Sequence, residues 1–474
     1  MKNFKELKKN LKKDFEGFKK LKIALLGDSA TQFLNQTLKA CAYEYELELD
    51  IWEADFNQIE RQILDHSSEL YEFSPDLVIV FHSSQKLLNK YNKKTVEETS
   101  LFAQQHLELV SALHNEITSH TKAKFIYYNF NEIDDNVFGN FSCNTESSFL
   151  FQLRKINYQL MVFASQNQGF YMVDVSTIQN LTGRTSFFSP SIYVNTDMTL
   201  SIDSLPLVCY RTMDLIGAMQ GKFKKCLILD LDNTTWGGVI GDDGMENIQI
   251  GGLGIGKAFT ELQYWAKKLK NRGIILCVCS KNTESVAKEP FEEHPDMVLR
   301  LDDIAVFVAN WESKVNNIRY IQEVLNIGFD SMVFLDDNPF ERNIVRENIA
   351  DIIVPELPED PAEYLPYLYS LNLFETISYS SEDAERTKKY QEQAKRSVLM
   401  KSFKNEDDFL SNLNMVSVVE PFTKFTTPRV AQLSQRSNQF NLRTKRYTES
   451  DIQDLANSDK HYTFTFTLED KFGN

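Results

Sequence analysis

The amino-acid sequence predicts an α/β fold with two doubly wound parallel-sheet domains, followed by a partial α+β segment. Two series of short apolar runs, with room for a helix between neighbouring runs, are typical of βαβ units. The pattern changes after Pro355, where prolines alternate with acidic residues. The 474 residues also exceed what one compact core usually holds, so we expect several domains.

An amphipathic helix is expected at the start of the chain, over residues 1–22. Apolar side chains recur there at steps of three and four residues among lysines, at Phe4, Leu7, Leu11, Phe15 and Phe18. This apolar stripe predicts a helix with one buried side. It packs either on the following domain or on a membrane surface or partner.

The first α/β domain is expected over residues 23–220. Five apolar runs predict its parallel strands, at residues 22–26, 48–52, 77–81, 125–130 and 171–175.

The second α/β domain is expected over residues 221–380, after a linker at 221–224. Its predicted strands are 226–231, 274–279, 297–301, 331–335 and 352–354, with helices at 257–270 and 314–325. Residues 381–474 are expected to form a helical connector, 381–401, and an incomplete domain with strands near 415–419 and 461–468. The last strand lies close to residue 474, which suggests an interrupted sheet.

Composition narrows the classes of function. Hydrophobic residues make up 42% and charged residues 25%, as in ordinary globular proteins. The net charge of -16 disfavours nucleic acid as a partner, and the apolar runs are too short to span a membrane. Six cysteines without framework spacing and the lack of a secretory signal predict free thiols and a cytoplasmic protein.

Paired carboxylates at predicted strand ends carry the chemistry. Asp230 and Asp232 follow one strand, and Asp336 and Asp337 follow another. Ligands bind at the carboxyl ends of parallel strands, so these side chains are expected to share one site. One carboxylate can attack phosphorus while the other transfers a proton. Four carboxylates together require a cation, and oxygen ligands with a phosphate substrate suit Mg²⁺.

Further polar residues follow the strand at 274–279 and begin the helix at 314–325. The hydroxyl of Ser280 and the backbone amides of Lys281 and Asn282 can bind phosphate oxygens. Lys314 can offset negative charge on the nucleophile and the transferring group. Each feature alone is also typical of an ordinary turn or loop. Their common order and placement predict phosphoryl transfer.

The set resembles the haloacid dehalogenase superfamily, whose first motif is DxDxT. Asp230, Asp232, Asn233 and Thr234 lie in that motif, and Ser280, Lys314, Asp336 and Asp337 match the later ones. Residues 229–241 and 279–282 are similar to the FkbH-like branch. The resemblance implies that Asp230 is the nucleophile and Asp232 the general acid and base. It also implies Mg²⁺ held by Asp230, the Asp232 carbonyl, Asp336 and Asp337, with phosphate contacts from Asn233, Thr234, Ser280, Lys281, Asn282 and Lys314.

The short segment between the first motif and the helix at 257–270 leaves room for a small flap and no large cap. An open site favours a phosphorylated acyl or carrier-bound substrate, and the chain is expected to act as a phosphatase. FkbH-like proteins are associated with handling a phosphoglyceryl group, which they move to a carrier-protein thiol with loss of phosphate, so the alternative is a glyceryl transferase. That alternative needs a thiol within reach of the site. Cys279, next to Ser280, is the candidate by position, unless it is a buried core residue of the strand. A binding scaffold with a vestigial site is the other alternative.

Two flanking segments have weaker resemblances. Asp28 and Ser29, after a strand, resemble the nucleophile block of SGNH hydrolases, with His82 as the candidate base near Ser29. The histidine usual near the end of that fold is missing, which favours a binding or docking role. Residues 429–441 resemble the region before an acetyltransferase-like domain, and either introduce a partial domain or cap the phosphatase domain.

Overall fold

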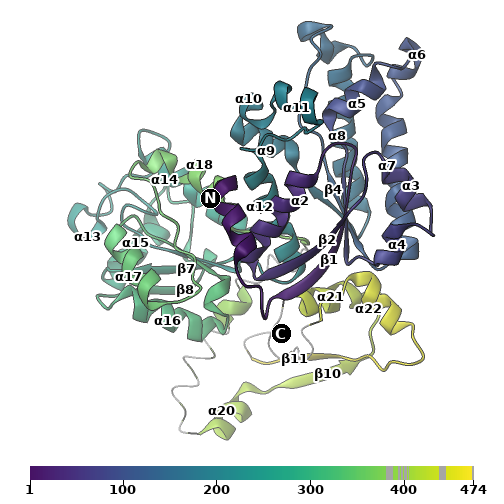
Figure 1. Ribbon diagram of the computed structural model, residues 1–474. Coiled ribbons are helices and arrows are strands. Elements are labelled where there is room, and N and C mark those ends of the chain that lie inside the picture. The colour runs from purple at the N-terminus through teal and green to yellow at the C-terminus, as the bar shows by residue number, and fades with distance from the viewer. Residues whose placement is uncertain are drawn as a thin grey trace. The chain divides into compact units, whose positions relative to one another are not determined.

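The structure is a computed structural model in which the chain forms two compact units, Met1–Ile216 and Gly217–Asn474 (Figure 1). It describes residues 1–379, 388–392, 396, 399, 403, 405–436 and 445–471. Each unit contains a parallel sheet, which confirms the predicted α/β class. Among the described residues, no helix is both long and apolar enough to cross a membrane.

The first unit is built on a five-stranded parallel sheet in the order β2-β1-β3-β4-β5. Its strands are β1 (Lys19–Gly27), β2 (Leu47–Glu53), β3 (Leu77–Phe81), β4 (Lys124–Tyr128) and β5 (Phe170–Val173). The strand order reverses between β1 and β3, and open α/β sheets bind ligands at such a switch point.

Helices cover both faces of this sheet. They are α2 (Gln32–Ala42), α3 (Ile59–Leu64), α4 (Glu69–Phe73), α5 (Ser84–Tyr91), α6 (Val96–Thr99), α7 (Phe102–His120), α8 (Phe149–Gln166), α9 (Val175–Thr182), α10 (Arg184–Phe187), α11 (Pro190–Thr196) and α12 (Leu205–Met219). Val78 and Val80 face the core formed with α3, α4, α7 and α8. Tyr128 faces the other side, where its hydroxyl lies 2.7 Å from that of Thr212 in α12.

The N-terminal helix is much shorter than predicted. Helix α1 spans Phe4–Lys8 and a 3-10 turn ends at Lys12, whereas residues from Lys19 onward belong to β1. The prediction of a helix over 1–22 was therefore wrong: the backbone becomes extended at Lys13, with φ -84° and ψ 164°, and pairing with β2 draws residues from Lys19 onward into the sheet. Leu7 is fully buried in this unit, as expected for packing on the following domain.

The second unit contains a four-stranded parallel sheet in the order β8-β7-β6-β9. Its strands are β6 (Cys226–Leu229), β7 (Ile275–Ser280), β8 (Ile304–Ala309) and β9 (Met332–Leu335). The prediction of a strand at 297–301 is wrong, because the strand at this point of the chain is β8, which begins at Ile304. The backbone amides of Val298 and Leu299 donate to the side chain of Gln263, at 2.9 and 3.2 Å, so this buried apolar segment has no strand partner.

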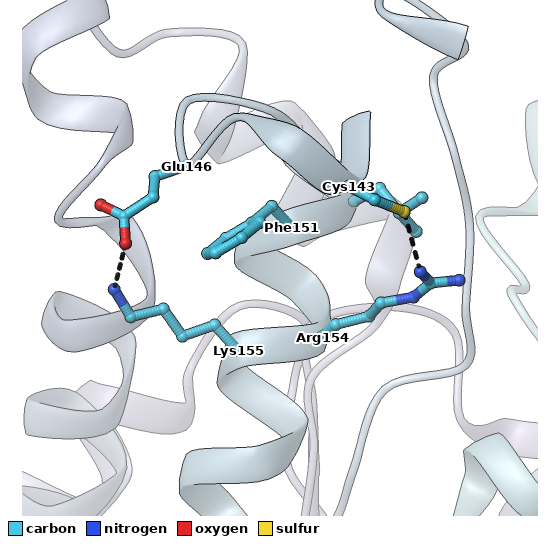
Figure 2. Close-up of a pocket in the computed structure, with 6 residues that line it drawn as sticks. Cys143, Glu146, Phe151, Arg154 and Lys155 are labelled. Atoms are coloured by element: carbon cyan, nitrogen blue, oxygen red, sulfur yellow. Dashed lines mark hydrogen bonds and ion pairs between the residues drawn. The ribbon is translucent and has the colours of Figure 1, made fainter. Parts of the chain in front are cut away.

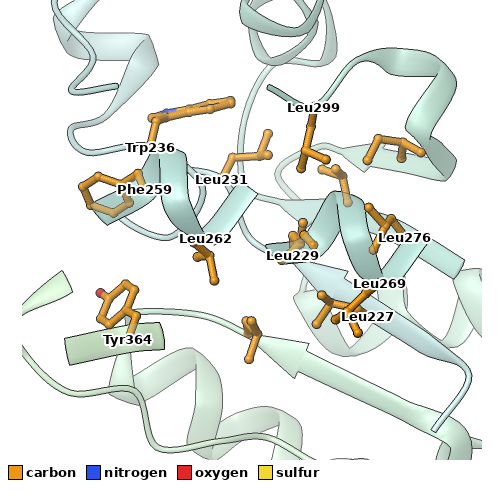
Figure 3. Close-up of a cluster of buried hydrophobic side chains, with 14 of the residues drawn as sticks. Leu227, Leu229, Leu231, Trp236, Phe259, Leu262, Leu269, Leu276, Leu299 and Tyr364 are labelled. Atoms are coloured by element: carbon orange, nitrogen blue, oxygen red, sulfur yellow. The ribbon is translucent and has the colours of Figure 1, made fainter. Parts of the chain in front are cut away.

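Side chains alternate between the two faces of this sheet, and each face has its own helices. These are α14 (Gly256–Asn271), α15 (Glu284–Glu293), α16 (Lys314–Leu325), α17 (Pro339–Asn348) and α18 (Tyr364–Leu371). Leu227 and Leu229 pack with α14, α15 and α18 (Figure 3). Cys226 and Ile228 pack on the other face with α16 and α17. The sheet is thereby buried on both sides, and its strand ends are left for function.

A small flap lies between β6 and α14. It contains one four-residue helix, α13 (Ile240–Asp243), and a two-way backbone pairing of Gly237 with Gln249 at 3.0 and 2.7 Å. Gly238 has a φ of 92°, which the turn into this flap requires. The predicted minimal cap is confirmed.

The C-terminal segment contains α20 (Glu406–Leu413), α21 (Thr427–Arg436) and α22 (Glu449–Ala456), with an antiparallel pair of strands. The strands are β10 (Val416–Glu420) and β11 (Thr465–Glu469). Parts of the predicted connector at 381–401 and of the acetyltransferase-like segment at 429–441 lie outside the described residues. The domain limits predicted for this part of the chain stay predictions.

Candidate active site

The sheet order of the second unit brings three strand ends together. Asp230 follows β6, Ser280 ends β7, and Asp336 follows β9. Strand β6 lies between the other two, so these residues meet at one edge. The predicted convergence of the motifs is therefore found in the structure.

Lys314 links the two acidic motifs. It is the first residue of α16, where the side chain of Ser313 caps the helix. Its Nζ lies 3.0 Å from Asp230 Oδ1 and forms a second ion pair with Asp336. Burial lowers the pKa of Lys314, but the charges of Asp230 and Asp336 outweigh burial and leave this pKa above its ordinary value. Lys314 is therefore a buried ammonium.

Three carboxylates surround this ammonium and form a triad. Oxygens of Asp230, Asp336 and Asp337 all lie within 4.8 Å of one another. Burial raises the pKa of Asp230 to about 7, with Asp336 adding to the effect and Lys314 opposing it. Burial and Asp336 also raise the pKa of Asp337. One lysine does not neutralise three carboxylates, and an oxygen-only ligand set fits Mg²⁺.

The side chain of Asp232 is held separately from this triad. Its Oδ1 accepts hydrogen bonds from Trp236 Nε1 at 3.0 Å and the Ile240 amide at 3.1 Å. Its Oδ2 accepts one from Asn282 Nδ2 at 2.9 Å. Asp232 is thus fixed beside the triad by the flap and by the loop after β7, which leaves only its backbone carbonyl as the predicted metal ligand.

The next two motif residues shape the turn. Asn233 has a φ of 53°, and its side chain accepts a hydrogen bond from the Gly238 amide at 2.9 Å. Thr234 is fully buried, and its hydroxyl accepts a hydrogen bond from the Asp337 amide at 2.9 Å. Thr234 therefore ties the first motif to the acidic pair. The predicted contacts of both residues with phosphate stay predictions.

The loop after β7 contributes one polar network and one ion pair. Asn282 Nδ2 also lies 3.2 Å from Ser280 Oγ, and both residues are almost fully buried. Lys281 points elsewhere: its half-exposed ammonium forms a 2.5 Å ion pair with Glu341 of α17. Ser280 and Asn282 thus lie at the site with Asp232, and the Lys281 side chain is anchored to the neighbouring helix.

Sequence reasoning missed three supporting residues. The Thr235 hydroxyl donates to the Asp230 carbonyl at 2.6 Å, and Trp236 binds Asp232 as described above. Arg342 is buried, and its Nη1 donates to the carbonyls of Asp336 and Asp337 at 2.8 and 2.6 Å. Thr235 and Trp236 directly follow the first motif, and Arg342 lies on the helix after the acidic pair. Their closeness in sequence to the motifs was the signal that could have identified these three residues.

The thiol of Cys279 lies in the core beside the site, with its Sγ 3.9 Å from the Lys314 carbonyl. It is fully buried in the core cluster that contains Ile228 and Cys277, on the side of the sheet covered by α16. Burial raises the pKa of its thiol well above the usual range. Side chains alternate along a strand, so Ser280 lies on the opposite side. The structure therefore supports Cys279 as a core residue.

In the first unit, Ser29 and His82 have partners other than each other. Ser29 is fully buried, and its Oγ lies 3.3 Å from Thr199 Oγ1. His82 Nδ1 lies 2.9 Å from the hydroxyl of Tyr127. Asp28 Oδ1 accepts a hydrogen bond of 2.9 Å from the backbone amide of Ser83, the residue that precedes α5. The nucleophile and base roles suggested for Ser29 and His82 have no support in these contacts.

Asp28→Asn is expected to stabilise the first unit at neutral pH. Burial raises the pKa of Asp28 to about 6, although the Ser83 hydrogen bonds lower it. The folded-state pKa exceeds the unfolded value of about 3.9, so ionisation lowers stability as pH rises from about 4 to 6. Asparagine can still accept the Ser83 hydrogen bond. The free energy of unfolding should rise by about 1–3 kcal/mol at pH 7.

Urea denaturation at neutral and at acidic pH measures this difference. The gain should vanish below about pH 3, where Asp28 is protonated in both states. Asp203→Asn, at an exposed position of the same unit, should change little at either pH. A less stable Asp28→Asn at pH 7 would contradict the prediction.

The first unit also contains a cavity of about 430 Å³ (Figure 2). It is lined by Cys143, Glu146, Leu150, Phe151, Arg154 and Lys155, and none of these is a predicted site residue. Arg154 Nη1 lies 3.4 Å from Cys143 Sγ, and Lys155 pairs with Glu146 at 3.8 Å. All six cysteines are free, and Cys143 is the exposed one.

Comparison with known proteins relates this architecture to a sequence family and to solved structures. The sequence model for the FkbH N-terminal domain matches residues 22–217. A solved structure, of the N-terminal part of the protein BF1531 from Bacteroides fragilis, contains a phosphatase domain complexed with Mg. It is 55% identical in sequence, with a TM-score of 0.77, and the match covers 80% of this chain and 100% of that one. No curated protein gives a significant match.

These matches cover both units, and the motifs at the edge of the second sheet are the ones expected from the sequence. The chain belongs to the FkbH-like branch of the haloacid dehalogenase superfamily.

Proposed function

We propose that this chain is a Mg²⁺-dependent phosphatase in which Asp230 receives the phosphoryl group. The observation that carries the proposal is the buried Lys314, which pairs with Asp230 and Asp336 inside a triad of carboxylates. The Bacteroides fragilis relative, whose phosphatase domain was crystallised with Mg, supports the same cation. Asp230, Asp336 and Asp337 would hold it, together with the Asp232 carbonyl.

The bound cation would polarise a phosphate oxygen and offset the charge of the triad. In the first step, a carboxylate oxygen of Asp230 forms a bond to phosphorus as the bond to the leaving oxygen breaks. Asp232 donates a proton to that oxygen, and Lys314 stabilises negative charge on the phosphoryl group. In the second step Asp232 takes a proton from water, which attacks phosphorus and releases Asp230 and inorganic phosphate.

The residues around Asp232 would keep it aimed at the reacting oxygen. Trp236, Ile240 and Asn282 donate to its two oxygens, so the flap and the loop after β7 share control of its orientation. The flap is small, which leaves room for a large substrate beside it. A phosphorylated acyl compound or a carrier-bound phosphate is therefore the proposed substrate class. The free thiols favour a reducing, cytoplasmic compartment.

Phosphate release tests this proposal. The panel contains p-nitrophenyl phosphate, phosphorylated acids and phosphorylated thioesters, assayed with Mg²⁺ and after its removal with a chelator. We expect turnover that requires Mg²⁺ and returns when the ion is restored. Turnover that is indifferent to the chelator would refute the role of the triad.

Glyceryl transfer is the second candidate, and the burial of Cys279 disfavours it. Incubation with a phosphoglyceryl donor followed by mass spectrometry distinguishes the two functions. A Cys143→Ser background removes the exposed thiol, which would otherwise collect unspecific adducts. An adduct on Cys279 that Asp230→Asn prevents would favour transfer. A vestigial scaffold is disfavoured, because Asp230, Asp232 and Lys314 are all present.

Mg²⁺ affinity should fall as the pH falls below 7. In the metal-free site the pKa of Asp230 is raised to about 7, so below this pH Mg²⁺ must displace a proton. The Kd should rise by about tenfold per pH unit below that pKa and be constant above about pH 8. Calorimetric titration of Mg²⁺ across this range measures the slope. Asp230→Asn should flatten it, and a pH-independent Kd in the unmodified protein would contradict the prediction.

A further inference from the structure

A second group of metal-ligating side chains lies in the first unit, on the surface of α7. Glu116 and His120 are four residues apart in the last turn of that helix, so they share one face. His66, from the loop between α3 and α4, meets them there. One ligand atom from each of the three residues lies within 4.8 Å of the other two.

Both imidazoles converge on the same carboxylate oxygen. His66 Nε2 contacts Glu116 Oε1, and His120 Nδ1 lies 3.3 Å from it. The two imidazole rings lie 3.9 Å apart, centroid to centroid. Zinc with ligands at about 2.0–2.1 Å places neighbouring tetrahedral donors about 3.3 Å apart. His120 Nδ1 and Glu116 Oε1 already have this spacing, whereas His66 Nε2 lies closer to Oε1 and would rotate away from it to admit the ion.

The loop that carries His66 is fixed by its own contacts. Asp65 Oδ1 accepts hydrogen bonds from the Ser67 amide at 2.9 Å and from its hydroxyl at 2.6 Å. The ring of Tyr71 packs edge to face against His66 at 5.4 Å, and its hydroxyl donates to the Ile63 carbonyl at 2.6 Å. A histidine on a fixed loop facing a helix is held near ligand geometry before any ion binds.

We propose that His66, Glu116 and His120 form a binding site for a divalent transition metal of the zinc class. Two imidazole nitrogens and one carboxylate oxygen suit Zn²⁺, whereas Mg²⁺ prefers oxygen ligands alone. The same chain thus carries two ligand sets of different chemistry, one in each unit. His66 and His120 are exposed and Glu116 is half-buried, so the ion can enter from solvent, and water completes its coordination.

Competition with a chromophoric zinc indicator tests the site in the full chain, with excess Mg²⁺ to occupy the acidic triad. The unmodified protein should take up one equivalent of Zn²⁺ at this site. His66→Ala and His120→Ala should each weaken that binding by at least about tenfold. His461→Ala, at an exposed histidine in the other unit, should leave it unchanged.

Two outcomes would overturn the site. Equal Zn²⁺ affinity in the unmodified protein, His66→Ala and His120→Ala would refute the proposed site. Loss of Zn²⁺ binding in Asp230→Asn alone would refute it too, because the ion would then bind at the acidic triad. Glu116→Gln, which keeps size and hydrogen bonding, guards against a folding defect and should also weaken binding. Co²⁺ substitution provides an independent readout, because the visible absorption of nitrogen-ligated Co²⁺ should be lost with either histidine.

Discussion

Asp230→Asn is expected to lower kcat by at least about 10⁴-fold, because the amide is not a nucleophile toward phosphorus. Asparagine has nearly the same shape, so the contact with Lys314 and the surrounding packing should persist. Rapid quenching followed by mass spectrometry should find the mass of one phosphoryl group on Asp230 in the unmodified protein. The same adduct should be missing from the variant.

Asp242→Asn is the matched control for this substitution. Asp242 is an exposed aspartate in the flap, so its replacement should leave kcat within about twofold of the unmodified protein. Asp232→Asn should behave differently from both: it should slow breakdown of the phosphorylated intermediate, which would then accumulate. Substantial turnover in Asp230→Asn would show that another residue is the nucleophile.

Lys314→Met is expected to lower both activity and stability. It leaves Asp230 and Asp336 buried without their partner, and breaking a buried ion pair costs about 3–5 kcal/mol. Losing the cation that faces the phosphoryl group should lower kcat by about 10²–10³-fold. Added Mg²⁺ should recover part of the stability, since the ion offsets the unpaired carboxylates. Chemical denaturation with and without Mg²⁺ measures this recovery.

Lys281→Met provides the control for lost charge. The Lys281 ion pair with Glu341 is partly exposed to solvent, so this substitution should cost less than about 1 kcal/mol. Lys314→Met combined with Asp336→Asn should be more stable than Lys314→Met alone, because one unpaired carboxylate is gone. Equal stability of Lys314→Met and Lys281→Met would refute the buried ion-pair network.

Much of the second sheet and of its site could be predicted from the sequence. Strands β6, β7 and β9 are continuous apolar runs that end in Asp, Ser or an acidic pair, and parallel pairing places such ends at one edge. Helix α16 occupies its predicted residues, 314–325, since its apolar periodicity is clear and Ser313 caps it. At these positions the pattern of apolar residues and the geometry of a parallel sheet predict the same structure.

Other features depended on tertiary contacts that the sequence does not display. Residues 297–301 form a mostly apolar run that is typical of a strand, but the side chain of Gln263, from α14, accepts hydrogen bonds from two of their backbone amides. Asp232 and Asp230 are both aspartates of one motif, yet the folded flap and the loop after β7 hold their carboxylates apart. Cys279 adjoins Ser280, and its exclusion from the site follows from the side of the sheet on which it lies.

The hydrogen bond from the Asp337 amide to Thr234 has a consequence for how the cation is captured. Together with Arg342, which donates to the carbonyls of Asp336 and Asp337, it fixes the spacing of the acidic triad through contacts within the protein. The site is therefore preorganised, and binding of the cation need not order any loop. Its association should be limited by shedding of hydration water from the ion, and the apo and metal-bound proteins should differ little in backbone structure.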